Sequence, residues 1–176
     1  VSQKSHNDQK LEIATLRRFL GLEMVNCAFN FILQMAKRKN RLLVFVYHRE
    51  VMDKCVRLSK QAGMNFLVLK SGQSKVRVEQ VINLFQKPTK NPITLFASIS
   101  NSNDTITLTA AEHIIFFEIS SIWELNFQAM SRVVRRGKIK HIGIDFLAFK
   151  NTYIERLLKH NLTKRKISEE FERGRK

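Results

Sequence analysis

Glycine, proline and cysteine are all scarce in this sequence, and each scarcity excludes a class of protein. The 176 residues include only 6 Gly and 2 Pro, which excludes a collagen-like or low-complexity chain. The two cysteines, Cys27 and Cys55, have no partners at zinc-ligand spacing, so we expect buried, reduced thiols in an intracellular protein. No apolar run approaches the roughly 20 residues of a membrane helix, and the polar start lacks the features of a signal peptide. We therefore expect no membrane partner.

Acidic residues are also few. The chain has 15 Asp and Glu against 31 Lys and Arg, which gives a net charge of +16. This excess favours a polyanionic partner, either nucleic acid or an anionic surface. A lysine-rich proteome or a solubility bias is the alternative explanation, but the excess is large and clustered. The 13 Phe and the apolar content of 44% are sufficient for a sizeable core.

Apolar segments of helical and strand character alternate along the chain. We expect Gly21 to divide the first helical stretch and Gly63 to end the second helix. The expected helices cover 15–39, 50–62, 75–86, 122–135 and 151–172, and the expected strands cover 41–47, 65–70, 93–99, 113–119 and 141–149. This alternation predicts an α/β fold, a parallel sheet with helices on both faces. One domain is expected at 15–172, after a polar segment at 1–14 and before a basic tail at 173–176.

The common motifs of self-contained enzymes are missing. The sequence has no G-x-x-x-x-G-K-[ST] or G-x-G-x-x-G, and no CxxC, HExxH or GxSxG. The chain therefore lacks the usual loop for cradling a triphosphate, and no metal site is expected. In an open parallel sheet, ligands bind at the carboxyl ends of the strands. The candidate loops are 47–50, 71–74, 98–105, 118–122 and the segment around 132–138.

The stretch "FQAMSRVVRRGKIK" places three arginines beside apolar residues. Arg132 and Arg135 are three residues apart and share a helix face, and Gln128 lies along the same stripe. Such a stripe can clasp a phosphate through charge-assisted hydrogen bonds. It can equally be a basic helix face in water, and these residues alone do not separate the two interpretations.

The same stretch resembles motif VI of superfamily-two helicases of the Swi/Snf type, Q-A-x-D-R-x-x-R-x-G-Q. Upstream, "LLVFVYHREVMD" resembles motif IV, "LVLKSGQSKVRVEQVINLF" a segment typical of the family, and "ASISNSNDTITLTAAEHIIFFE" motif V with the strand after it. The resemblance covers about residues 15–160 in the right order and is closest to the annealing-helicase, or fork-remodelling, branch. The residues that match motif VI are Gln128, Ala129, Arg132, Arg135 and Gly137.

The resemblance implies the second RecA-like lobe of an ATP-dependent translocase on double-stranded DNA. The first lobe would then be a partner and would hold most of the ATP and Mg, so the isolated chain should be inactive. Arg135 would be the arginine finger, Arg132 its companion and Gln128 a coupling residue. The implied contacts to duplex or forked DNA are His48, Arg49, Ser71, Gly72, Gln73, Ser98, Ser100 and Asn101. The protein would be nuclear if eukaryotic.

Two other interpretations remain open at this point. Ser131 replaces the acid of motif VI, Asn103 stands near where motif V often has glycine, and Trp123 is displaced from the family position. These departures suit a lobe that has lost catalysis and serves as a nucleic-acid-binding or scaffolding module. The other interpretation is an unrelated α/β domain, such as a small-molecule transferase. The missing glycine-rich loop and the basic charge weigh against it. A single histidine such as His48 is also often structural. Its position in the motif IV match makes a structural role and a nucleic-acid contact about equally well supported.

Overall fold

The structure is a computed structural model, which describes the backbone of residues 6–100, 106–133 and 142–173. Side chains are described for the same segments, except for residues 6–8, 10 and 164–173. Five parallel strands form one sheet in the order β2-β3-β1-β4-β5. The strands are β1 (Arg41–Val46), β2 (Phe66–Leu69), β3 (Ile93–Ser98), β4 (His113–Phe116) and β5 (Gly143–Phe146). The predicted α/β fold with a parallel sheet is confirmed.

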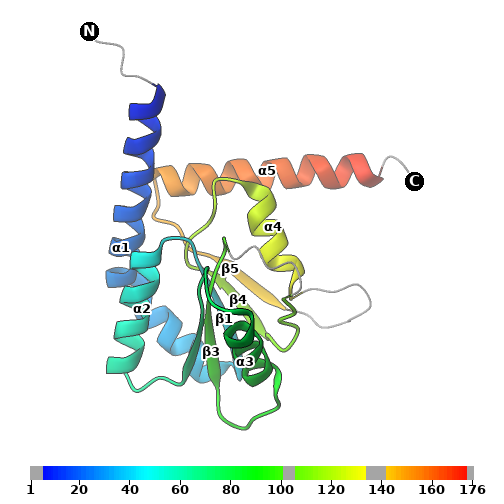
Figure 1. Ribbon diagram of the computed structural model, residues 1–176. Coiled ribbons are helices and arrows are strands. Elements are labelled where there is room, and N and C mark those ends of the chain that lie inside the picture. Colours follow the sequence, from blue (N-terminus) through cyan, green and yellow to red (C-terminus); the bar gives the residue numbers. More distant parts are fainter. Residues whose placement is uncertain (1–5, 101–105, 134–141, 174–176) are drawn as a thin grey trace.

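Helices cover both faces of this sheet (Figure 1). They are α1 (His6–Arg38), α2 (Arg49–Gln61), α3 (Lys75–Gln86), α4 (Trp123–Ser131) and α5 (Tyr153–Arg173). Successive side chains of a strand point to opposite faces, and the central strand β1 serves both cores. Its Leu43 and Phe45 pack with residues of α3 and α4, whereas Leu42 and Val44 pack with residues of α1 and α2. Burial on both faces explains why this strand is apolar at almost every position.

The first helix differs from its prediction. It starts at His6, before the expected start at Thr15, and it continues through Gly21 without a break. Gly21 therefore does not divide the helix, and that prediction is wrong. The prediction for Gly63 is confirmed, because this residue has φ +62° directly after α2 and its N–H bonds to the Lys60 carbonyl.

Part of α1 is long and apolar enough to cross a membrane, by length and composition alone. This part is Leu11–Arg38, although its sequence contains no continuous apolar run of about 20 residues. In the fold, however, its Val25, Phe29 and Ile32 are buried against the sheet and α2. Core helices of water-soluble domains pass the same test, and this packing accounts for the apolar residues in the second half of α1. Large apolar side chains in its first half, such as Phe19, are exposed.

The two cysteines lie in different environments, which corrects the expectation that both are buried. Cys27 is exposed on α1, whereas Cys55 is buried in α2. Loss of hydration raises the pKa of the Cys55 thiol to about 12, and the nearby Glu118 carboxylate adds to this shift.

We expect one thiol per native molecule to react with an aromatic disulfide reagent at about pH 8. A pKa far above this pH leaves Cys55 almost entirely protonated, and only the thiolate reacts. The second thiol should react after unfolding in denaturant, and Cys27→Ser should remove the fast reaction. Equal reaction rates of both thiols in the native protein would contradict this assignment.

Candidate nucleic-acid interface

The loops that follow β1, β2 and β3 enclose a cavity of about 500 Å³. Seven of the eight predicted nucleic-acid contacts line it, and the eighth, Asn101, lies outside the described residues. The complete lining is Val46, Tyr47, His48, Arg49, Met52, Lys70, Ser71, Gly72, Gln73, Ser98 and Ser100. The structure thus brings predicted contacts that are up to 52 positions apart in sequence, from His48 to Ser100, to one edge of the sheet.

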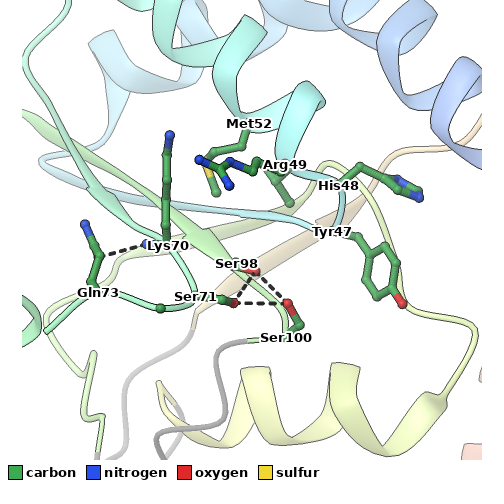
Figure 2. Close-up of a pocket in the computed structure, with 11 residues that line it drawn as sticks. Tyr47, His48, Arg49, Met52, Lys70, Ser71, Gln73, Ser98 and Ser100 are labelled. Carbon is green, nitrogen blue, oxygen red and sulfur yellow. Dashed lines mark hydrogen bonds between the residues drawn. The ribbon is translucent and has the colours of Figure 1, made fainter. Parts of the chain in front are cut away.

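Three serine hydroxyls meet at one side of this cavity (Figure 2). The Oγ of Ser98 lies 2.9 Å from that of Ser100, and the Oγ of Ser71 lies 3.3 Å from the first and 3.2 Å from the second. A hydroxyl can rotate its proton toward whichever acceptor is present. The three groups can therefore exchange their mutual hydrogen bonds for bonds to an anion.

The turn after β2 holds Ser71 in place. Gly72 adopts φ +80°, a left-handed conformation that costs glycine little. The Gln73 side chain closes the turn, because its Oε1 accepts a hydrogen bond of 2.9 Å from the Lys70 N–H. In this structure Gly72 and Gln73 shape the loop, and their role as direct contacts stays a prediction.

Positive charge lines another side of the cavity, where Arg49 and Lys70 extend from the loops (Figure 2). Arg49 is the exposed first residue of α2, and the N-cap residue makes no side-chain capping bond to that helix. An uncapped helix start leaves backbone N–H groups and a partial positive charge. Lys70 is less available, because its Nζ lies 2.5 Å from the Asp53 carboxylate. Arg49 is therefore the cation most open to a ligand at this edge.

His48 lines the cavity, but its ring points away from the three serines (Figure 2). Its Nδ1 lies 2.6 Å from Oε1 of Glu118, which follows β4 and is only 7% exposed. The sequence predicted a contact at His48 and missed Glu118 as its partner. The ring contact is structural, and the main chain of His48 is also bonded, since its N–H donates to Glu118 and its carbonyl accepts from the Met52 N–H. The role of His48 as a nucleic-acid contact stays a prediction.

The predicted arginine stripe is only partly described. Gln128 is exposed on α4, whereas Arg132 follows the end of that helix and is 7% exposed. The Arg132 carbonyl accepts a hydrogen bond of 2.8 Å from the Leu108 N–H. Because Arg132 is packed into the lobe, it does not share an open face with Gln128. Helix α4 also ends at Ser131 and not at 135 as expected. Arg135 and Arg136 lie outside the described residues.

Comparison with known proteins gives a consistent result. The helicase conserved C-terminal domain family matches residues 23–137. An uncharacterized ATP-dependent helicase of Mycoplasma pneumoniae is 26% identical over 140 residues, which cover 80% of this chain and 14% of that protein. The SWI/SNF-related matrix-associated actin-dependent regulator of chromatin subfamily A-like protein 1 of Drosophila melanogaster is 27% identical over 126 residues, or 72% of this chain and 16% of that protein.

A solved structure supports the fold. The crystal structure of the C-terminal part of the Fun30 ATPase domain superposes with a TM-score of 0.61 and 23% identity, and it covers 68% of this chain and 38% of that one. The chain spans only 14% and 16% of the length of the two relatives above. The family match extends from α1 to the motif VI segment and thus includes the loops of the cavity. This chain belongs to the helicase C-terminal domain family, as a RecA-like second lobe of the Swi/Snf type.

Proposed function

We propose that this lobe works in an ATP-dependent translocase on double-stranded DNA and that its cavity at the ends of β1, β2 and β3 holds a DNA phosphate. The observation that carries the proposal is the meeting of three hydroxyls with Arg49 and an uncapped helix start. Phosphate oxygens accept hydrogen bonds from all three kinds of donor. The net charge of +16 provides the attraction over longer distances.

Binding through phosphates does not depend on base sequence. Hydroxyls, guanidinium groups and backbone N–H groups position a nucleic acid but do not read its bases. A translocase needs this property, since it must grip every step of a duplex equally well. Binding to duplex or forked DNA, and membership in the annealing branch, are part of the same proposal and rest on the resemblance of the motifs.

The ATP site would be shared with a first lobe. The sequence has no glycine-rich phosphate loop, and the described residues contain no group of three His, Cys, Asp or Glu that could hold a metal ion. In this proposal the lobe is a half-site that adds charge to a nucleotide and Mg held elsewhere. Arg135 would supply that charge as the finger, with Arg132 as its companion and Gln128 as a coupling residue.

We expect the 176-residue chain to bind a short duplex DNA with an affinity that falls steeply as salt rises. Each phosphate contact releases counterions, so the logarithm of the affinity should fall linearly with the logarithm of the salt concentration. Arg49→Ala should weaken binding about fivefold and reduce the salt slope by about one. Fluorescence anisotropy over a salt series measures both quantities.

Arg57→Ala is the matched control for Arg49→Ala. Arg57 is exposed on the same helix α2, carries the same charge and does not line the cavity. Its replacement should change the affinity less than that of Arg49. Salt-independent binding, or equal losses for both variants, would show that the cavity is not the phosphate site.

A lobe that binds DNA without supporting catalysis is the second candidate. The burial of Arg132 favours it, because a companion to the finger must reach the nucleotide across the gap between the lobes. This candidate predicts the same DNA binding by the chain but no ATP turnover by the protein that carries both lobes. The family match excludes the interpretation of the chain as an unrelated α/β domain such as a transferase.

A further inference from the structure

We propose that Glu118 is a positioning residue that fixes the turn between β1 and α2, so that Arg49 and the start of α2 face the bound phosphate. This inference rests on the proposed function of the cavity. Glu118 lies after β4, outside the cavity lining, and acts through the backbone of the turn. The turn and Glu118 are 70 residues apart in sequence, so only the fold brings them together.

The Glu118 carboxylate contacts the turn at three points. Its Oε2 accepts hydrogen bonds from the Tyr47 N–H at 2.9 Å and from the His48 N–H at 2.8 Å. Its Oε1 lies 2.6 Å from Nδ1 of His48. The backbone N–H groups of two consecutive residues and the ring of the second are thus bound to one side chain. Because His48 is the N-cap residue of α2, this arrangement also sets the direction in which the helix starts.

Helix α1 closes the other side of the carboxylate. A Cβ atom on Gly21 would lie 2.4 Å from Oε1 of Glu118, which means that the helix backbone packs directly against this group. Arg17, one turn earlier, donates a hydrogen bond of 2.6 Å to the Ile119 carbonyl and lies 4.9 Å from the centre of the Tyr47 ring. The carboxylate is therefore enclosed by α1, β4 and the turn, and it has little freedom to leave its three donors.

The negative charge of Glu118 makes a positioning role distinguishable from a simple charge effect. A carboxylate close to a phosphate site repels the phosphate, so its charge alone would weaken binding. The buried carboxylate also carries a desolvation cost, which its three hydrogen bonds offset. If Glu118 acts by geometry, a shorter acid should weaken DNA binding, whereas a neutral side chain of the same length should largely preserve it.

The test compares Glu118→Asp with Glu118→Gln in the 176-residue chain, with short duplex DNA as the probe. Aspartate keeps the charge but is one methylene shorter, so it cannot reach all three donors. Glutamine can accept both backbone N–H groups through its oxygen and donate through its nitrogen to Nδ1 of His48. We expect the dissociation constant to rise about tenfold for the aspartate variant and less than threefold for the glutamine variant.

Amide NMR spectra provide a readout that a loss of stability alone would not change. The signals of Arg49 and Glu50 at the start of α2 should shift in folded Glu118→Asp and stay close to their native positions in Glu118→Gln. In Glu118→Gln, Nδ1 of His48 should change from a proton donor to an acceptor, which its ¹⁵N chemical shift reports. If Glu118→Asp does not fold, Gly21→Ala applies the same test, because it displaces the carboxylate from the α1 side.

The outcomes separate this inference from the proposed function. If native protein binds DNA and Arg49→Ala weakens binding, but Glu118→Asp binds as native protein does, the positioning role is wrong. Tighter DNA binding by both Glu118 variants would show a charge effect. Equal losses of DNA affinity in both variants would show that the hydrogen bonds to the turn, which glutamine keeps, do not matter for binding. Either result overturns the inference. Absence of salt-dependent binding by the native chain would instead refute the proposed function.

Discussion

Replacing Arg135 with alanine should abolish DNA-stimulated ATP hydrolysis by the polypeptide that joins this lobe to its first lobe. A guanidinium group can contact two phosphate oxygens at once and offset the charge that develops during phosphoryl transfer. Arginine fingers of this kind are worth about 10³–10⁵ in turnover rate. A coupled assay of ATP turnover with saturating duplex DNA measures the loss, and DNA binding and the unfolding temperature should stay near the native values.

Arg136→Ala is the control for this experiment. Arg136 is adjacent to Arg135 and carries the same charge, but it is not among the residues that match motif VI. Its replacement should leave turnover within a few-fold of the native rate. Comparable turnover by Arg135→Ala and the native polypeptide would mean that Arg135 is not the finger.

Arg132 gives a less direct test of the same chemistry. Arg132 is only 7% exposed, and its carbonyl at the end of α4 accepts a hydrogen bond from the Leu108 N–H. Truncating a buried arginine removes packing as well as charge, so Arg132→Ala should lower the stability of the lobe in addition to any loss of turnover. A defect in this variant would therefore have two explanations, whereas Arg135→Ala tests the motif VI match itself.

The fold was largely predictable because strands and helices of this chain carry different apolar patterns. β1 is apolar on both faces, and the predicted bounds of α3, 75–86, coincide with Lys75–Gln86 in the structure. The first helix was mispredicted at Gly21 because glycine usually weakens a helix interior. The Glu118 side chain, almost 100 residues later, occupies the space that a Cβ would need and so favours glycine there, and no local pattern contains that information.

For the candidate site, the grouping of the loops was predictable, but the direction of the side chains was not. Loops at the carboxyl ends of parallel strands must meet, so the grouping of Ser71, Ser98 and Ser100 followed from the order of elements. Side-chain direction did not follow, and the His48 ring turns to Glu118. Arginines were equally ambiguous, since Arg41 is 5% exposed and donates a hydrogen bond of 2.8 Å from Nε to the Phe85 carbonyl. A structural arginine and a phosphate ligand look alike in sequence.

Gly21→Ala should destabilise the chain by about 2 kcal/mol, although alanine is the better helix former by about 1 kcal/mol. The new Cβ would lie 2.4 Å from Oε1 of Glu118 and 2.9 Å from Cγ2 of Val51. Both neighbours are packed in the interior, so the helix or the carboxylate must move. Urea unfolding measures the change in the free energy of unfolding. Asn30→Ala, at an exposed site of the same helix, is the matched control and should be neutral or stabilising.

A double-mutant cycle with Glu118→Ala identifies the contact that is responsible. Removing the carboxylate eliminates the closest atom to the new methyl group, whereas the contact with Val51 remains. Gly21→Ala should therefore cost less in the Glu118→Ala background, with a coupling free energy of about 1 kcal/mol or more. Equal costs in both backgrounds would show that α1 does not pack on the carboxylate. Glu118 would then lack the enclosure that holds it against the turn before α2.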